Sequence, residues 1–157
     1  MNDAQQTHGS VTVRAVAAEE VRPLRHAVLR PGRPLSAGNF SGDDEPTTRH
    51  FGAYRDRALL GVASIYRAEL PEQPGLTAIQ LRGMAVAPDA RGSGIGRQLI
   101  QACVAFTREN GVDLLWCNAR VTALGFYQRL GFEIVGEEFE IPDVGPHFRM
   151  ALRLAQA

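Results

Sequence analysis

Hydrophobic and polar positions change their period several times along the chain, and each change predicts a different element. Residues 11–16 alternate as a half-buried strand does, and residues 17–29 follow the helical period with two acids in the first turn. Two β runs, 50–55 and 59–68, predict an antiparallel hairpin around a two-residue turn. The Pro- and Gly-rich residues 31–48 predict a loop with room for a short helical turn. Pro23 fits the first helix only near its start.

The second half of the chain predicts strands and helices in alternation. In chain order they are a strand at 77–86, a helix at 95–110, an apolar strand at 112–117, a short helix at 123–130, and strands at 132–140 and 148–154. The loop between the last two strands is expected at 141–147, and Thr122 is expected to cap the short helix. Glycines at 111 and 131 are expected to end the two helices.

Length and charge narrow the function classes. The 157 residues suit one domain, expected at 11–157 after a disordered, polar tail at 1–10. A formal net charge of zero gives no general attraction to nucleic acids or anionic membranes. With no apolar signal core and no apolar run near the ~20 residues of a membrane span, we expect a cytoplasmic protein.

The two cysteines and the many arginines add to this picture. Cys103 falls on an apolar helix face and Cys117 in an apolar strand, so both are expected to be small buried hydrophobes in a reducing compartment. No metal or disulfide is expected. All 17 basic side chains are Arg, whose planar fork binds two phosphate oxygens at once.

A glycine-rich turn between a strand and a helix predicts an anion site. The first N–H groups of a helix lack intrahelical partners, and the helix dipole adds positive potential there. Glycines let a phosphate approach these groups closely. The segment concerned is Arg91, Gly92, Ser93, Gly94, Ile95, Gly96 and Arg97. It is not a P-loop, since the chain has no Lys, and its G-x-G-x-G spacing departs from the Rossmann G-x-G-x-x-G.

Two blocks resemble the hallmarks of the GNAT superfamily of N-acetyltransferases. Residues 84–99, MAVAPDARGSGIGRQL, are similar to its coenzyme A loop, where Arg91, Gly94 and Gly96 match Arg/Gln-x-x-Gly-x-Gly/Ala. Residues 118–133, NARVTALGFYQRLGFE, are similar to its second hallmark. The resemblance implies an α/β (α+β) fold: a mixed, mostly antiparallel sheet of six to seven strands, a splay between the strands at 77–87 and 112–118, and about four flanking helices.

The resemblance also implies roles. The chain would transfer an acetyl group from acetyl-CoA to a primary amine of a small molecule or peptide, by direct attack in a ternary complex. The strand residues Met84, Ala85 and Val86 would bind the pantetheine arm, with Asn118 as a polar contact. Tyr127 would be the general acid for the leaving thiolate. Gly83 indicates close backbone approach or a bulge in this strand.

The general base and the acceptor stay open at this stage. We favour Glu138 or His147 as base; further candidates are Glu140, Asp143, Asp43, Asp44, Glu45, His50 and a water chain. The acids at 137, 138 and 140 also suit a solvated strand edge. Residues 30–48 and 139–147 are expected to wall the acceptor pocket, and their carboxylates favour a cationic amine. The alternatives are a non-catalytic acyl-CoA-binding sensor and a nucleotide-binding domain of another fold. The chain is expected as a monomer or homodimer.

Overall fold

The elements follow the predicted order closely. The computed structural model describes residues 10–154, so most of the predicted tail and the last three residues lie outside it. The elements are β1 Val11–Val16, α1 Ala18–Leu29, β2 Arg49–Arg55, β3 Ala58–Arg67, β4 Ala78–Val86, α2 Ile95–Glu109, β5 Leu114–Arg120, α3 Leu124–Arg129, β6 Glu133–Ile141 and β7 Gly145–Arg153. Three short 3-10 helices are η2 Leu35–Gly38, η3 Pro88–Ala90 and η4 Val121–Ala123.

The strands form a seven-stranded mixed sheet, which confirms the predicted fold class. Their order is β1-β2-β3-β4-β5-β7-β6. β4 and β5 are parallel, whereas β1 with β2, β5 with β7, and β6 with β7 are antiparallel. β6 is an edge strand, as the acids at 137, 138 and 140 suggested.

Four local expectations need correction. The residues described contain three α-helices, because the fourth expected element is only the 3-10 turn η2 in a segment rich in Pro and Gly. Pro23 lies at the sixth position of α1, where packing of the helix outweighs the lost hydrogen bond. Thr122 lies within η4, and α3 has no side-chain cap. His147 lies in β7, because a tight turn with Asp143 at φ 66° replaces the longer loop.

The chain divides into two compact units. The first comprises residues 10–64 and 83–103, and the second comprises residues 65–82 and 104–154. β3, β4 and α2 each pass from one unit to the other. Each unit has its own buried cluster and is described below by itself.

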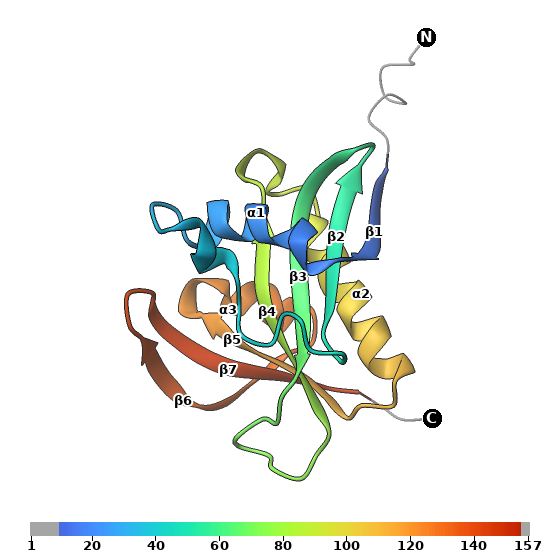
Figure 1. The fold of residues 1–157 in the computed structure, drawn as a ribbon. Helices are drawn as coiled ribbons and strands as arrows, with labels where there is room; N and C mark the ends of the chain where they lie inside the picture. Colours follow the sequence, from blue (N-terminus) through green and yellow to red (C-terminus); the bar gives the residue numbers. More distant parts are fainter. Residues whose placement is uncertain (1–9, 155–157) are drawn as a thin grey trace. The chain divides into compact units, whose positions relative to one another are not determined.

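In the first unit, one face of α1 packs on the sheet. Val21, Val62 and Ala85 form a buried cluster, which places α1 against β3 and the end of β4 (Figure 1). The start of α2 packs closely on β3 at Gly61, where a Cβ atom would lie 2.8 Å from Ile95 Cγ2 and 3.0 Å from Leu99 Cδ1. The missing side chain of Gly61 therefore allows the start of α2 to lie close to β3.

In the second unit, the long segment between β3 and β4 covers part of the sheet. Leu70, Ala78, Leu114, Trp116 and Ala151 form its buried cluster. The indole Nε1 of Trp116 donates to the carbonyl of Ala68 over 2.8 Å, which ties this segment to β5. β6 and β7 form a long curved hairpin (Figure 1). None of the helices in residues 10–154 is long and apolar enough to cross a membrane.

Candidate active site

The glycine-rich loop leads from β4 through η3 directly into α2. Gly92 and Gly94 have φ of +83° and +82°, a region that L side chains rarely adopt. The Ser93 hydroxyl donates to the carbonyl of Ala90, which closes the turn. Gln98 N donates to Gly94 O over 3.1 Å and so makes the first turn of α2.

The loop has the properties of an anion cradle. Because the first helical bond starts at Gln98, the N–H groups of Ile95, Gly96 and Arg97 have no partner within α2. The first turn contains no acidic residue, so the positive end of the helix dipole is not compensated. A Cβ at Gly92 or Gly94 would meet no atom within 4 Å, which leaves open space beside the backbone. The residues fit the pyrophosphate of an acyl-CoA, as the sequence predicts.

Gly83 confirms the expected irregularity in the strand before the loop. Its φ is +66°, and a Cβ there would lie 2.9 Å from Arg25 Nε and 3.3 Å from Phe40 Cε2. The close approach is therefore made by side chains of the first unit. Met84, Ala85 and Val86 follow directly, with Ala85 buried in the cluster beneath α1.

Tyr127 is almost fully buried in the second unit. Its ring makes edge contacts with Phe126 and Phe132 at centroid distances of 5.1 and 5.4 Å. Burial raises the pKa of the Cys117 thiol to about 12, while a hydrogen bond from the Tyr127 hydroxyl acts in the opposite direction. The phenol hydroxyl therefore lies near the sulfur of Cys117 in β5. Donation to a sulfur atom is also what an acid that protonates a thiolate must do.

Asn118 follows Cys117 at the point where β5 loses its register with β4. The β4–β5 register ends at Leu81↔Cys117, while β5 continues to Arg120 in register with β7. The side-chain Oδ1 of Asn118 is buried and has no hydrogen-bond partner. Buried polar atoms without partners are rare and often mark the place of a ligand or a water. This orphaned oxygen fits the predicted contact with an amide of the pantetheine arm.

The two favoured base candidates have different surroundings. His147 is buried, and its Nδ1 donates to the carbonyl of Gly145 over 2.7 Å, which assigns the remaining ring nitrogen, Nε2, as the proton acceptor. Its ring packs on Phe139 at 5.9 Å. Glu138 is exposed, in the irregular part of β6 between Val135 and Phe139.

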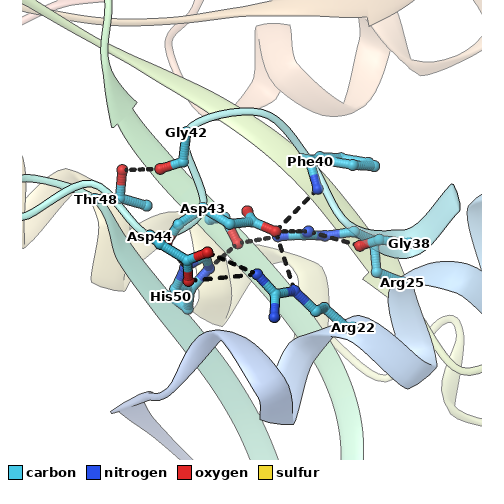
Figure 2. A network of polar contacts seen from close by, with 10 residues as sticks. Arg22, Arg25, Gly38, Phe40, Gly42, Asp43, Asp44, Thr48 and His50 are labelled. Atoms are coloured by element: carbon cyan, nitrogen blue, oxygen red, sulfur yellow. Dashed lines mark hydrogen bonds and ion pairs between the residues drawn. The ribbon is translucent and has the colours of Figure 1, made fainter. Parts of the chain in front are cut away.

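Asp43 of the first loop and His50 of β2 belong to a buried network around Arg25 (Figure 2). Arg25 Nη1 donates to Asp43 Oδ2 and to Gly38 O over 2.8 and 2.9 Å, and Nη2 donates to Ser64 Oγ over 2.8 Å. Phe40 covers the guanidinium at 4.1 Å. We call Arg25, Asp43, Ser64 and His50 the Arg25 framework.

Hydrogen bonds within the Arg25 framework already engage the Asp43 carboxylate and both ring nitrogens of His50, which were candidates for the general base. His50 Nε2 donates to the carbonyl of Asp43 over 3.0 Å, so Nδ1 accepts from the Ser64 hydroxyl over 2.6 Å. Asp43 accepts from Arg25, Arg22 and the Phe40 N–H. Asp44 contacts Arg22 at 3.4 Å, and Glu45 lies on the surface. The carboxylate of Asp43 therefore anchors the loop instead of attracting a substrate.

Sequence reasoning missed a polar pair in the second unit. Arg149 Nη1 donates to Glu72 Oε2 over 2.9 Å, and the guanidinium lies over Phe139 at 4.9 Å. Gly136, at φ +78°, makes room for the carboxylate, since a Cβ there would lie 2.7 Å from Glu72 Oε2. Glu72 and Arg149 are 77 residues apart, so no local pattern joins them.

Comparison with known proteins agrees with the geometry. A sequence model described as "Acetyltransferase (GNAT) domain" matches residues 46–134. The chain is 33% identical over 138 residues to "Uncharacterized N-acetyltransferase YitI" of Bacillus subtilis, covering 88% of this chain and 93% of that one. The solved structure of FeeM, an N-acyl amino acid synthase from uncultured soil microbes, shares the fold with a TM-score of 0.76 at 17% identity, covering 92% and 91% of the two chains.

A second solved structure shows the same fold together with a cofactor. Aminoglycoside 6'-N-acetyltransferase complexed with coenzyme A has a TM-score of 0.74 at 15% identity, with 93% and 98% of the two chains covered. The fold and the family match define an acyltransferase. The chain belongs to the GNAT family of acetyltransferases.

Proposed function

We propose that this protein is an acetyl-CoA-dependent N-acetyltransferase that acetylates a primary amine of a small molecule or peptide in a ternary complex. The observation that carries the proposal is the loop at residues 91–97, with two positive-φ glycines, open space beside them and N–H groups at the start of α2 that have no partner within the helix. YitI bears the name N-acetyltransferase, and the aminoglycoside 6'-N-acetyltransferase was solved with coenzyme A. Both support acyl-CoA as the donor.

The proposed reaction needs one bond to form and one to break. The neutral amine attacks the thioester carbonyl, the C–N bond forms, and the C–S bond breaks with the electron pair leaving on sulfur. Tyr127 donates its hydroxyl proton to this thiolate. In the first unit, the backbone of Met84 and Val86 binds the pantetheine arm, while Arg91 and Arg97 neutralise the phosphates. In the second unit, the side chain of Asn118 is the polar contact to the cofactor.

We assign the proton-accepting role to His147 in preference to Glu138. The bond from Nδ1 to the Gly145 carbonyl fixes the tautomer and leaves Nε2 with a lone pair. Glu138, by contrast, is exposed on the edge strand. His147 takes the proton that the attacking ammonium must lose before or during the attack.

The proposed acid and the proposed base lie on opposite faces of β5 and β7. Tyr127 contacts Cys117, whose side chain alternates with that of Asn118 along β5. Asn118 is the cross-strand partner of Arg149, and His147 lies two residues from Arg149 on the same face of β7. An amine can therefore approach on the Asn118 face while the thiolate leaves toward Tyr127. Two free, buried cysteines support action in a reducing compartment such as the cytoplasm.

Ligand-dependent stabilisation and release of free thiol together test this function. We expect acetyl-CoA and CoA to raise the melting temperature, with ATP and NAD having little effect. An amine screen with thiol detection should then find acetyl-CoA turnover that depends on the amine. Stabilisation by ATP or NAD in preference to CoA would overturn the assignment of the donor. Stabilisation by acetyl-CoA with no turnover across a broad amine panel would favour a sensor.

Tyr127→Phe tests the chemical step. We expect kcat to fall by about 10²- to 10⁴-fold, the usual contribution of a general acid, while acetyl-CoA still stabilises the protein. Tyr54→Phe is the matched control, because Tyr54 is also a buried tyrosine. Its hydroxyl donates to the carboxylate of Glu20 over 2.6 Å, so the control also removes a hydrogen-bonded hydroxyl. An unchanged kcat in Tyr127→Phe would remove the general-acid role.

A further inference from the structure

The face of β5 and β7 that carries Asn118 and Arg149 contains two buried polar atoms without a hydrogen-bond partner. Asn118 and Arg149 are directly paired across the strands, so their side chains lie on the same face. Asn118 Oδ1, an acceptor, and Arg149 Nε, a donor, are both buried without a hydrogen-bond partner. A ligand that offers both a donor and an acceptor can satisfy the two atoms together.

The charges of Arg149 and Glu72 indicate which charges a complementary ligand would carry. Arg149 uses Nη1 for Glu72, which leaves the edge formed by Nε and Nη2 for a second carboxylate. Glu72 accepts at Oε2, so its second oxygen is available to a cationic donor. The side chains of Arg149 and Glu72 are 29% and 30% exposed, so part of each is accessible from solvent, although Arg149 Nε itself is buried. The pair therefore presents one positive and one negative group to a ligand.

Neighbouring residues hold the side chains of Arg149 and Glu72 in position. Phe139 lies under the Arg149 guanidinium at 4.9 Å and holds its plane, and Gly136 provides the space that the Glu72 carboxylate occupies. His147 lies on the same face two residues along β7, with Nε2 as its acceptor nitrogen. A carboxylate anchored at Arg149 thus places a neighbouring amine near the proposed base and beside the proposed contact to the pantetheine arm.

We propose that Arg149, Glu72 and Asn118 form a subsite for the carboxylate and the α-amino group of a free α-amino acid, which is the acetyl acceptor. The proposal rests on the function proposed above and specifies its substrate class. Arg149 binds the carboxylate through the fork of Nε and Nη2, and Glu72 accepts from the ammonium. Asn118 Oδ1 has two lone pairs, so it accepts from the ammonium with one and from the pantetheine amide with the other. This assignment replaces the purely cationic amine that the loop carboxylates suggested, since Asp43 belongs to the Arg25 framework.

Matched acceptors test the subsite in the full-length protein. We would measure thiol release from acetyl-CoA with the free protein amino acids, their carboxamides and the decarboxylated amines. For an accepted side chain, the free acid should exceed its carboxamide in kcat/KM by about 10- to 100-fold, the range for a hydrogen bond to a charged group. Equal or faster acetylation of the carboxamides would overturn the subsite and leave the acetyltransferase function intact. No transfer to any amine, despite acetyl-CoA binding, would overturn both.

Arg149→Gln tests the residue itself. We expect the preference for the free acid over the carboxamide to disappear, mainly through a higher KM for the free acid. Arg153→Gln is the control, because Arg153 lies on the same face of β7 and contacts the same segment through Gln73 at 3.2 Å. If Arg149→Gln fails to fold, Arg149→Lys keeps the charge and loses the fork, and it should lose the preference in the same way. A preference retained in a folded Arg149 variant would contradict the proposal.

Discussion

Two arginine–carboxylate pairs, one in each unit, have similar bond lengths and different environments. Arg25 and Asp43 meet at 2.8 Å with side-chain exposures of 0% and 2%, whereas Arg149 and Glu72 meet at 2.9 Å with exposures of 29% and 30%. Arg25 also contacts Gly38, Ser64 and the Phe40 ring, whereas the side chains of Arg149 and Glu72 each keep a solvent-exposed part. The buried pair holds a loop in place, and the half-exposed pair has capacity for a ligand.

The largest effect should come from breaking the buried pair. Asp43→Asn leaves the guanidinium of Arg25 uncompensated in the interior, and we expect the free energy of unfolding to fall by about 3–5 kcal/mol. Urea unfolding followed by tryptophan fluorescence measures it. Glu72→Gln breaks the partly exposed pair with Arg149, and we expect it to lower the free energy of unfolding by only about 0–1 kcal/mol. Equal destabilisation by the two variants would remove the distinction between framework and site.

A smaller effect should follow from filling the space beside the framework. Gly83→Ala should cost about 1–2 kcal/mol for the left-handed backbone, and additionally press on Arg25 Nε, 2.9 Å from the new Cβ. Gly111→Ala is matched in backbone, with φ of +68° against +66°, but has nothing within 4 Å of its Cβ. The difference between their free energies of unfolding isolates the packing contribution. If the two losses are equal, the framework is not tightly packed against β4.

The smallest effect concerns the thiols, one buried in each unit. Burial raises the pKa of Cys103 and of Cys117 to about 12 from the ordinary 9.0. The unfolded chain loses these protons first, so the thiols leave stability unchanged below about pH 9 and lower it as the pH rises from 9 toward 12. At pH 8 we expect no reaction of the native protein with a thiol reagent, and two thiols titrated after denaturation. Rapid labelling of the folded protein would contradict this account.

Local sequence patterns were sufficient to predict most of the fold and part of the candidate active site. The spacing of the glycines and the helical period located the loop at 91–97, because turn chemistry and helix starts are set by neighbouring residues. The position of Tyr127 depended on the resemblance to the family. The Arg25 framework and the Arg149–Glu72 pair were not predictable, since their members are 18 and 77 residues apart. The prediction that His147 lies in a loop was wrong. A tight turn with Asp143 at positive φ lets β7 begin at Gly145, before His147.

Binding of coenzyme A to two aspartate variants tests the central claim most directly. Gly94→Asp places a carboxylate and a side chain beside the free N–H groups at the start of α2, and Gly111→Asp places the same group after its end, at a similar positive φ and in open space. Calorimetric titration of the folded variants should show that Gly111→Asp binds coenzyme A with unchanged affinity. Gly94→Asp should bind it at least about 100-fold more weakly, since opposed like charges cost several kcal/mol. Coenzyme A binding by Gly94→Asp at the wild-type affinity would contradict the placement of the pyrophosphate in this loop.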